Sequence, residues 1–227
     1  MRLNKYLSDA GVCSRREAGE ITINGKRAET GMQVESGDVV VVKGKTVVPE
    51  EKKVYLAFNK PRGIVCTAEK REKNNVIDYL SYPVRIYPVG RLDKDSEGLL
   101  LMTNDGAIVN GIMRARNRHE KEYQVEVNKE ITPEFLKKMA SGVPILDTVT
   151  RPCRIRKTGE RSFTIILTQG LNRQIRRMCE ALGYRVTKLK RVRIMNIHLK
   201  DLKTGEYRPL TEKELAELKK QIGEEKR

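Results

Sequence analysis

The sequence predicts an α+β fold. Strand patterns and helix patterns follow one another irregularly along the 227 residues, without the regular strand–helix–strand rhythm of a doubly wound sheet. Hydrophobic residues make up 38% of the chain, enough to form a core, and no internal repeat is visible. The charged stretch Gly44–Lys53 contains Pro49 and is typical of a linker. We therefore predict a small first domain at residues 1–48, a linker at 49–53 and a larger second domain at 54–227.

The first domain begins with signals for two helices. Leu3, Leu7 and Val12 have the spacing of a short helix with one apolar face. Ser14 and Glu17 have the spacing of a capping box, which predicts that a second helix begins at Ser14.

Strands are predicted where apolar residues run together or alternate. In the first domain, Asn24-Gly25 is a favoured two-residue turn between two short strands. In the second domain, alternation places Tyr123, Val125 and Val127 on one face of a strand. The other predicted strands are Val39–Val42, Val54–Phe58, Leu99–Met102 and Phe163–Leu167.

The helices of the second domain are predicted from their ends. Each candidate start has a side chain that can accept a hydrogen bond from the first turn, and two of the helices are followed by a glycine stop. The candidate starts are Asp105, Thr132, Asn172 and Thr211, and the glycine stops are Gly142 and Gly183.

The charge balance points to a polyanionic partner. The chain has 46 basic and 30 acidic residues, a formal net charge of +16 and a sequence pI near 9.8. Such a field attracts nucleic acid and releases its counterions on binding. An anionic membrane is the alternative, but no basic amphipathic helix of the membrane-surface type is visible, and no apolar run approaches the roughly 20 residues that span a bilayer. The polar N-terminus carries no secretion signal, so we expect the cytoplasm.

The cysteine and histidine content disfavours several kinds of site. The chain has four scattered cysteines without a C-x-x-C pair and only two histidines. Structural disulfides, a zinc site and a Ser-His-Asp triad are therefore not expected.

One loop concentrates carboxylates. Asp93, Asp95 and Glu97 fall within five residues, just before the predicted strand at Leu99. A calcium loop would need a bidentate glutamate at its twelfth position, where this chain has Asn104. A solvated, charged turn is the other ordinary interpretation, and the segment alone does not decide between that and a catalytic loop.

Three arginines stand at the start of the helix predicted near Asn172. Cations there oppose the helix dipole, so Arg173, Arg176 and Arg177 require an anionic partner. In one interpretation all three bind phosphate. In the other, one of them pairs with a carboxylate of the Asp93 loop and keeps that carboxylate ionised and oriented.

Tyr123 also has two interpretations. It shares a strand face with apolar residues, which is typical of a core position, and it could equally stack on a nucleotide base. Aromatic residues make up only 5% of the chain, so we do not expect stacking of aromatic rings on the bases of single-stranded nucleic acid to be a main mode of binding.

Four strings stand in a defined order and spacing along the chain: Asn59–Gly63, Gly90–Asp93 with Glu97–Leu100, Lys121–Tyr123 and Asn172–Met178. Together they resemble the RsuA/RluB/RluE/RluF family of bacterial pseudouridine synthases. Residues Leu3–Leu7 and Cys13–Ala18 resemble an S4 RNA-binding domain. The resemblance spans nearly the whole chain, and Arg118–Tyr123 with Gly142–Leu146 favours one member of the family. It implies a mixed, largely antiparallel sheet with flanking helices and a central RNA cleft, preceded by a small S4-like domain.

The resemblance assigns roles by motif position. Asp93 matches the catalytic aspartate, Tyr123 the tyrosine that packs on the target uracil, and Arg176 the arginine that ion-pairs with that aspartate. Leu189 matches an apolar residue that lines the pocket. Further substrate contacts are expected from Arg91, Leu92, Asn172, Arg173, Gln174 and Arg177. RNA contacts are expected from Arg2, Lys5, Arg15, Arg16, Lys60, Lys190 and Arg191.

The implied reaction is isomerisation of a uridine in large-subunit (23S) ribosomal RNA to pseudouridine, with a transfer RNA (tRNA-Tyr) as a second substrate. A hairpin or bulge lowers the cost of taking the uridine out of its stack. Atoms are conserved in the reaction, so we expect no cofactor and no metal, and we expect a monomer. Whether Asp93 attacks C1′, attacks the base or removes a sugar proton stays open.

Two departures from the family pattern stand beside the resemblance. The chain is several residues shorter between Ala18 and Ile21, which shortens the predicted second helix of the S4-like domain, and it lacks the long basic tail of some relatives.

Three other functions remain to be separated from this one. A non-catalytic S4-type ribosome assembly factor would explain the charge but not the motifs around Asp93 and Arg176. An S4-bearing RNA methyltransferase would need a G-x-G-x-x-G loop, which is absent. A base-excising glycosylase that uses Asp93 would release free uracil.

Overall fold

The computed structural model describes residues 1–10, 12, 21–29, 31–49, 52–69, 71–113 and 118–223. The chain forms two compact units. The first comprises Met1–Val54 and Tyr82–Ile86, and the second comprises Tyr55–Ser81 and Tyr87–Arg227. No sequence pattern indicated that the short segment Tyr82–Ile86 belongs with the first unit. The helix predicted to begin at Ser14 lies outside the described residues.

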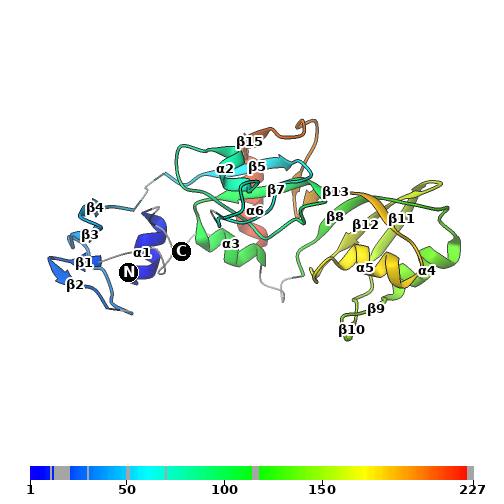
Figure 1. Cartoon of the computed structure of the whole chain (residues 1–227), viewed down its shortest axis with the longest axis horizontal. Coiled ribbons are helices and arrows are strands. Elements are labelled where there is room, and N and C mark those ends of the chain that lie inside the picture. The colour runs from blue at the N-terminus through cyan, green and yellow to red at the C-terminus, as the bar shows by residue number, and fades with distance from the viewer. Residues whose placement is uncertain are drawn as a thin grey trace. The chain divides into compact units, whose positions relative to one another are not determined.

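The first unit, drawn in blue in Figure 1, contains a helix and a four-stranded antiparallel sheet. The predicted short helix is present as α1 (Leu3–Asp9), but it ends before Val12, which was expected on its apolar face. Its Leu3 and Leu7 pack against buried valines of the sheet region. The predicted hairpin is confirmed, because Asn24-Gly25 forms its turn with φ angles of 51° and 78°. The strands, in the sheet order β2-β1-β3-β4, are β2 (Lys26–Arg27), β1 (Ile21–Ile23), β3 (Val40–Val42) and β4 (Lys45–Val47).

Strand β4 lies inside the charged stretch Gly44–Lys53, where the sequence pattern predicts no strand. Its residues Lys45 and Thr46 are exposed, so the apolar alternation that would reveal a strand is weak. β4 pairs with β3 across a second two-residue turn. The first unit therefore extends its sheet into residues that look like linker.

The second unit is built on a nine-stranded mixed sheet. The strand order is β11-β12-β8-β13-β7-β5-β15, with β14 paired to β13 and β6 paired to β7. Among the described pairings of this sheet, only β13 with β7 is parallel, so the expected mixed, largely antiparallel sheet is confirmed. The strands are β5 (Tyr55–Lys60), β6 (Tyr87–Pro88), β7 (Glu97–Thr103), β8 (Lys121–Val127), β11 (Arg154–Gly159), β12 (Ser162–Leu167), β13 (Val186–Ile194), β14 (Ile197–His198) and β15 (Tyr207–Pro209).

Helices and a small hairpin flank this sheet. Three predicted helix starts are confirmed: Asp105 accepts a hydrogen bond from the amide of Ala107, Thr132 caps its helix, and Thr211 forms a capping box with Glu214. The helices are α2 (Val76–Leu80), α3 (Gly106–Met113), α4 (Pro133–Ser141), α5 (Gln174–Ala181) and α6 (Glu212–Gln221), and the hairpin is β9 (Pro144–Ile145) with β10 (Thr148–Val149).

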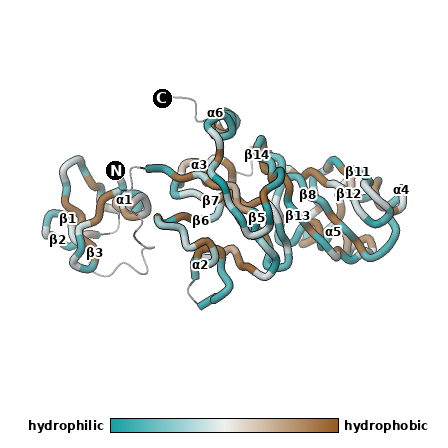
Figure 2. The backbone as a smooth tube through the Cα atoms, turned by 90° about the horizontal axis from the view of Figure 1, so that it is seen from above, coloured by the Kyte–Doolittle hydropathy of each residue, from teal (hydrophilic) through white to brown (hydrophobic). Residues whose placement is uncertain are grey.

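Two apolar clusters anchor the sheet. In one, α4 and α5 pack against β8, β12 and β13, with Phe163, Ile165 and Met178 fully buried. In the other, α3 and α6 pack against β5 and β7. The apolar residues of β7 and β12 colour brown in the tube of Figure 2. The loops before β7 and before α5 are thereby carried on rigid elements.

The start of α5 differs from the prediction. Asn172 was the expected cap, but Arg173 occupies the capping position in the left-handed conformation, with φ 50°, and makes no side-chain capping bond. The side-chain oxygen of Asn172 instead accepts a hydrogen bond from Arg177 at 3.2 Å. Gln174 accepts one from the amide of Leu171 at 3.1 Å. The loop is thus closed by contacts of its own polar side chains, and Arg173 projects from its rim.

Gly98 is required where the two parallel strands meet. Its φ is +107°, and a Cβ atom there would lie 2.2 Å from the carbonyl oxygen of Arg191 on β13. A substitution must therefore push β7 and β13 apart or strain the backbone.

We expect Gly98→Ala to lower the free energy of unfolding by about 3 kcal/mol, because it combines a steric clash with a disfavoured φ. Urea unfolding followed by circular dichroism measures the change. Gly170→Ala is the matched control, because a Cβ at Gly170 would meet nothing within 4 Å. Equal unfolding midpoints for the two variants would contradict the assignment.

Candidate active site

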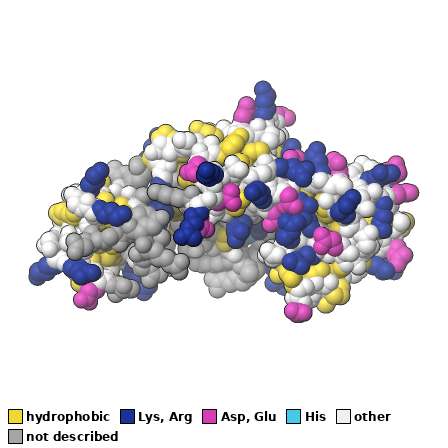
Figure 3. All heavy atoms as spheres, viewed as in Figure 1, with side chains coloured by type: hydrophobic (Ala, Val, Ile, Leu, Met, Phe, Trp, Pro, Cys, Tyr) yellow, Lys and Arg dark blue, Asp and Glu magenta, His cyan; other side chains and the backbone are white. Residues whose placement is uncertain are grey.

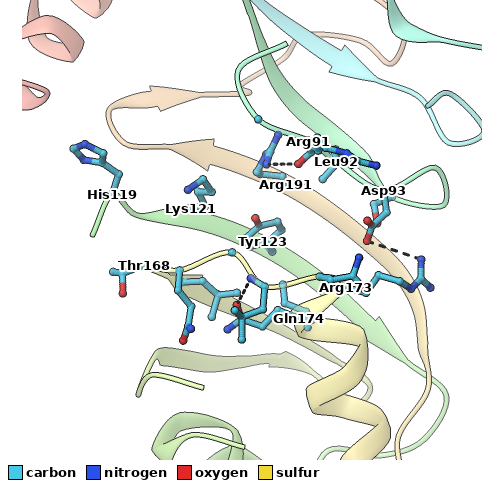
Figure 4. Close-up of a pocket in the computed structure, with 18 of the residues that line it drawn as sticks. Arg91, Leu92, Asp93, His119, Lys121, Tyr123, Thr168, Arg173, Gln174 and Arg191 are labelled. Carbon is cyan, nitrogen blue, oxygen red and sulfur yellow. Dashed lines mark hydrogen bonds and ion pairs between the residues drawn. The ribbon is translucent and has the colours of Figure 1, made fainter. Parts of the chain in front are cut away.

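A cavity of about 600 Å³ opens in the second unit where β8, β13 and the loops before β7 and α5 converge (Figure 4). Its volume is typical of a site for a small molecule or a single nucleoside. Among the predicted substrate contacts, the residues that line it are Arg91, Leu92, Asp93, Tyr123, Asn172, Arg173, Gln174 and Leu189. Residues that are far apart in the chain, such as Arg91 and Leu189, thus line one cavity.

Asp93 stands on a loop that is fixed by its neighbours. The side chain of Leu92 is buried, and the amide of Leu92 donates to the sulfur of Cys66 at 3.4 Å. The carbonyl of Asp93 accepts from the amide of Ser96 at 3.0 Å, which closes a turn. The next carbonyl, that of Lys94, accepts from the amide of Gly63 at 2.7 Å. The carboxylate of Asp93 is about one-third exposed and faces the cavity (Figure 4).

Two arginines of the 173–177 cluster pair with two carboxylates of the Asp93 loop. Arg173 donates to both oxygens of Asp95 at 3.1 Å, and its Nη1 lies 4.0 Å from Oδ2 of Asp93. Arg176 places its Nε 3.5 Å from Oδ2 of Asp95. The interpretation in which this cluster meets the Asp93 loop is therefore confirmed.

Arg176, which the resemblance pairs with Asp93, forms its ion pair with Asp95 in this structure. The guanidinium of Arg176 is buried and donates to the carbonyl of Asp95 at 3.0 Å and to the hydroxyl of Ser96 at 3.2 Å. It holds the loop from behind, whereas Arg173, half-exposed on the rim, reaches Asp93. Burial raises the pKa of Asp95, but the hydrogen bonds from Arg173 and the charges of Arg176 and Arg173 outweigh burial and hold that pKa below its usual value.

Tyr123 packs on the core and is also open to the cavity. Its ring lies over the apolar cluster of α4 and α5 and also forms part of the cavity wall (Figure 4). In the sheet it stands directly across from Arg191, and Val125 stands across from Leu189. One face of the ring is therefore supported by core, and the ring is held in place beside the cavity.

Several expected RNA contacts lie elsewhere. Arg177 binds the carbonyl and side chain of Asn172 at 3.1 and 3.2 Å and does not line the cavity. Lys190 is half-buried on β13, outside the cavity lining. Arg2 and Lys5 are exposed on the first unit, and Arg15 and Arg16 lie outside the described residues. Lys and Arg side chains recur over the face of the second unit in Figure 3, with acidic side chains between them.

Two of the expected RNA contacts, Lys60 and Arg191, are buried, and of these Arg191 lines the cavity. Lys60 is fully buried, and its ammonium donates to the carbonyls of Pro61 at 2.9 Å and Ile64 at 2.7 Å. Arg191 is 3% exposed, and its Nε donates to the carbonyl of Leu99 at 2.7 Å. Their long side chains satisfy backbone carbonyls at the base of the site, where phosphates cannot reach Lys60.

We expect Lys60→Met to lower the free energy of unfolding by about 2 kcal/mol, because two buried carbonyls lose a charged donor. RNA affinity should stay unchanged. Urea unfolding and filter binding of a ribosomal RNA fragment measure the two quantities. The exposed neighbour Lys94 supplies the control Lys94→Met, which should leave stability unchanged. Lost RNA affinity with unchanged stability would restore Lys60 as an RNA contact.

Three residues of the site carry no role in the sequence-based assignment. Asp95 binds both arginines, and His119 and Lys121 line the cavity beside Tyr123 (Figure 4). Strand alternation offered a signal for Lys121, because it lies two residues before Tyr123 and shares its face. Burial lowers the pKa of Lys121 to about 8, and the charge of Arg191 acts in the same direction.

The described residues offer neither a metal site nor a membrane-spanning helix. No group of three or more His, Cys, Asp and Glu side chains in the described part of the chain could hold a metal ion. None of the described helices is long and apolar enough to span a bilayer.

Comparisons with known proteins show which proteins the chain is similar to. A family model described as RNA pseudouridylate synthase matches residues 54–181, and an S4 domain model matches residues 1–40. A protein of Salmonella typhi named "Dual-specificity RNA pseudouridine synthase RluF" is 55% identical over 97% of this chain and 79% of its own length. Its namesake in Escherichia coli (strain K12) is 53% identical over 98% of this chain and 79% of its own length. RluF is the member that the strings at Arg118–Tyr123 and Gly142–Leu146 favoured.

A solved structure supports the likeness at the level of the fold. A crystal structure titled as that of a pseudouridylate synthase superposes with a TM-score of 0.73 and 28% identity, and covers 96% of this chain and 99% of its own. The likeness therefore extends through both units of the chain.

Proposed function

This chain belongs to the RNA pseudouridylate synthase family and carries an S4 domain at its N-terminus, and we propose that its cavity isomerises a uridine of large-subunit ribosomal RNA to pseudouridine. One observation carries the proposal. The carboxylate of Asp93 faces a nucleoside-sized cavity, 4.0 Å from a guanidinium nitrogen of Arg173, with Tyr123 on the wall of the same cavity.

The arrangement suits a uridine that has left its stack. The uracil ring can lie against Tyr123 and Leu189, with its sugar toward Asp93. In the reaction the C1′–N1 bond breaks, the detached uracil turns, and a C5–C1′ bond forms. The C5 proton is then lost and N1 gains a proton, so the atoms balance without a cofactor.

Each charged residue has a distinct task in this mechanism. Asp93 acts on the sugar or base as nucleophile or as stabiliser of an electron-poor sugar, as carboxylates do in glycoside chemistry. Arg173 faces its carboxylate from the rim at 4.0 Å, and Arg176 fixes the loop from its buried side through Asp95 and Ser96. In this division Arg176 is a positioning residue and not the direct partner of Asp93.

The substrate assignment rests on likeness and charge. The relatives named RluF are called dual-specificity RNA enzymes, which supports two RNA substrates; we assign ribosomal RNA as one and a transfer RNA as the other. The S4 domain and the net charge of +16 support a structured RNA, a hairpin or a bulge, held by its backbone. We place the reaction in the cytoplasm, where ribosomal RNA is processed in bacteria, and assign it to a monomer.

The direct test is conversion of a defined RNA. Purified protein is incubated with a large-subunit ribosomal RNA transcript, and pseudouridine is mapped by chemical modification and primer extension. The expected result is pseudouridine at one position, with no free uracil. A protein that binds the transcript without converting it would be an assembly factor, and release of free uracil would identify a glycosylase. Parallel incubation with a tRNA-Tyr transcript tests the second substrate.

A further inference from the structure

Lys121 lies in the cavity without an assigned task. It begins β8, and strand alternation directs it to the same side as Tyr123. Both residues line the cavity, and Figure 4 shows Lys121 between His119 and Tyr123. A uracil ring that lies against Tyr123 would therefore have the amine of Lys121 near its edge.

The amine of Lys121 has no partner among the described residues. The acidic neighbours along the chain, Glu120 and Glu122, are both bound by Arg193, at 3.0 and 2.8 Å. His119 is engaged differently, since its Nε2 lies 3.2 Å from the carbonyl of Gly111. Lys121 is thus a half-buried amine that faces a cavity and meets no anion there within the described structure.

A second cation stands on the strand next to Tyr123. Arg191 lies directly across from Tyr123 in the sheet, lines the cavity, and keeps its buried Nη2 without an acceptor among the described residues. A guanidinium group is a poor proton donor and acceptor, whereas an amine such as that of Lys121 can exchange a proton. The edge of the cavity around Tyr123 is therefore positively charged, which suits the negative charge of a detached uracil.

We infer that Lys121 is a catalytic group of this site, and that its amine moves the proton from C5 to N1 of the uracil. The inference rests on the proposed function. After the C5–C1′ bond forms, C5 still holds its hydrogen and N1 lacks one. The neutral amine takes the C5 proton, the C5–H electron pair restores the ring's conjugation, and the resulting ammonium gives a proton to N1. The amine is regenerated, so no other acid or base is consumed.

The ring and the amine have the geometry for both transfers. C5 and N1 are two bonds apart across C6, so a flexible lysine side chain can reach both from one place. With a pKa of about 8, the neutral and charged forms of Lys121 are both well populated near neutral pH. The other charged or titratable groups that line the cavity are Arg91, Asp93, His119, Tyr123, Arg151, Arg173 and Arg191. Of these, Arg191 is the one whose charge acts on the pKa of Lys121.

The test follows the C5 proton directly. A transcript that carries [5-³H]uridine releases tritium when C5 is deprotonated, and single-turnover rates are measured for the wild type, Lys121→Met and Lys121→Arg. We expect both variants to release tritium at least about 100-fold more slowly while RNA affinity is unchanged, because an unassisted proton transfer is slow. Lys138→Met is the control, since Lys138 is exposed on α4 and pairs with Glu134.

Chemical rescue separates proton transfer from a structural role. Lys121→Ala should regain activity when methylamine or another small primary amine is added. The wild-type rate should rise as pH increases through about 8, because the neutral amine is the acceptor. The rescued variant should instead follow the pKa of the added amine. A fully active Lys121→Arg would mean that only the charge matters, and would overturn the inference.

Failure of this inference can be told from failure of the proposed function. An active wild type with an equally active Lys121→Met removes the role of Lys121 and leaves the isomerase intact. A Tyr123→Phe variant that alone blocks tritium release would assign the proton to Tyr123. A wild type that forms no pseudouridine removes both proposals.

Discussion

Asp93→Asn is expected to lower the rate of pseudouridine formation at least about 1,000-fold, because losing a nucleophile or charge stabiliser removes transition-state stabilisation that no neighbour replaces. The amide is nearly isosteric with the carboxylate, so the loop and the cavity should persist. RNA affinity should change little, because Asp93 itself makes no contact that attracts phosphate. Single-turnover conversion of the ribosomal RNA transcript, with the enzyme in excess, measures the chemical step.

Two companion variants sharpen this prediction. Asp201→Asn removes an exposed aspartate that does not line the cavity, and should retain full activity. Asp95→Asn keeps Asp93 but weakens the anchor of Arg173 and Arg176, and should have an intermediate rate. Full activity of Asp93→Asn would remove Asp93 from the chemistry and, with it, the mechanism proposed for the cavity.

Arg176→Met should lower the rate about 100-fold and the free energy of unfolding by about 3 kcal/mol, because it removes a buried guanidinium and leaves its acceptors without that donor. The lost donor serves the carbonyl of Asp95 and the hydroxyl of Ser96, which shape the loop that carries Asp93. RNA affinity should be nearly unchanged, since Arg176 is buried. Urea unfolding, RNA binding and single-turnover conversion report the three quantities separately.

Arg173→Met is the comparison that separates the two arginines. Arg173 is half-exposed, so its loss should change stability by less than about 1 kcal/mol. Its loss should lower both the rate and RNA affinity, because the rim guanidinium can meet a phosphate as well as Asp93. Equal losses of rate and RNA affinity in Arg176→Met, without loss of stability, would make Arg176 a phosphate contact and reverse the assignment.

The helices that sequence predicts well are those fixed by local contacts. Asp105, Thr132 and Thr211 each accept a hydrogen bond from an amide two or three residues ahead, so their chemistry is complete within one turn. Asn172 could accept the same kind of hydrogen bond, but it does not cap its helix. Arg177 binds its side chain instead, and contacts to Asp95 shape the loop. A cap prediction is weakest where the residue also takes part in a functional loop.

The central strand β13 escaped prediction for two reasons. Basic residues interrupt its apolar ones, so the string from Val186 to Ile194 looks like a solvated segment. Register shifts at Val186/Lys188 and Arg191/Arg193 also break the strict two-residue alternation by which a strand is recognised. Both features serve the site, because they bring Leu189 and Arg191 to the cavity.

The sequence predicted which loops form the site, but not which side chains pair with each other inside it. Motif positions predicted that Asp93, Tyr123 and the arginine cluster meet, and the sheet brings them together. Which arginine faces Asp93 depends on how deeply each arginine side chain is buried behind the loop. That burial is set by contacts with residues that are far away in the sequence. Lys60 and Arg191 were expected at the surface because such residues rarely lie buried, and here backbone carbonyls hold them inside.

The most direct measurement is a crystal structure of the protein with a ribosomal RNA fragment whose mapped target uridine is replaced by 5-fluorouridine, in which fluorine blocks the final loss from C5. The account predicts the base extruded into the cavity, its ring against Tyr123, and the sugar C1′ within about 3.5 Å of the Asp93 carboxylate. RNA that runs over the protein with every base stacked and the cavity empty would contradict it.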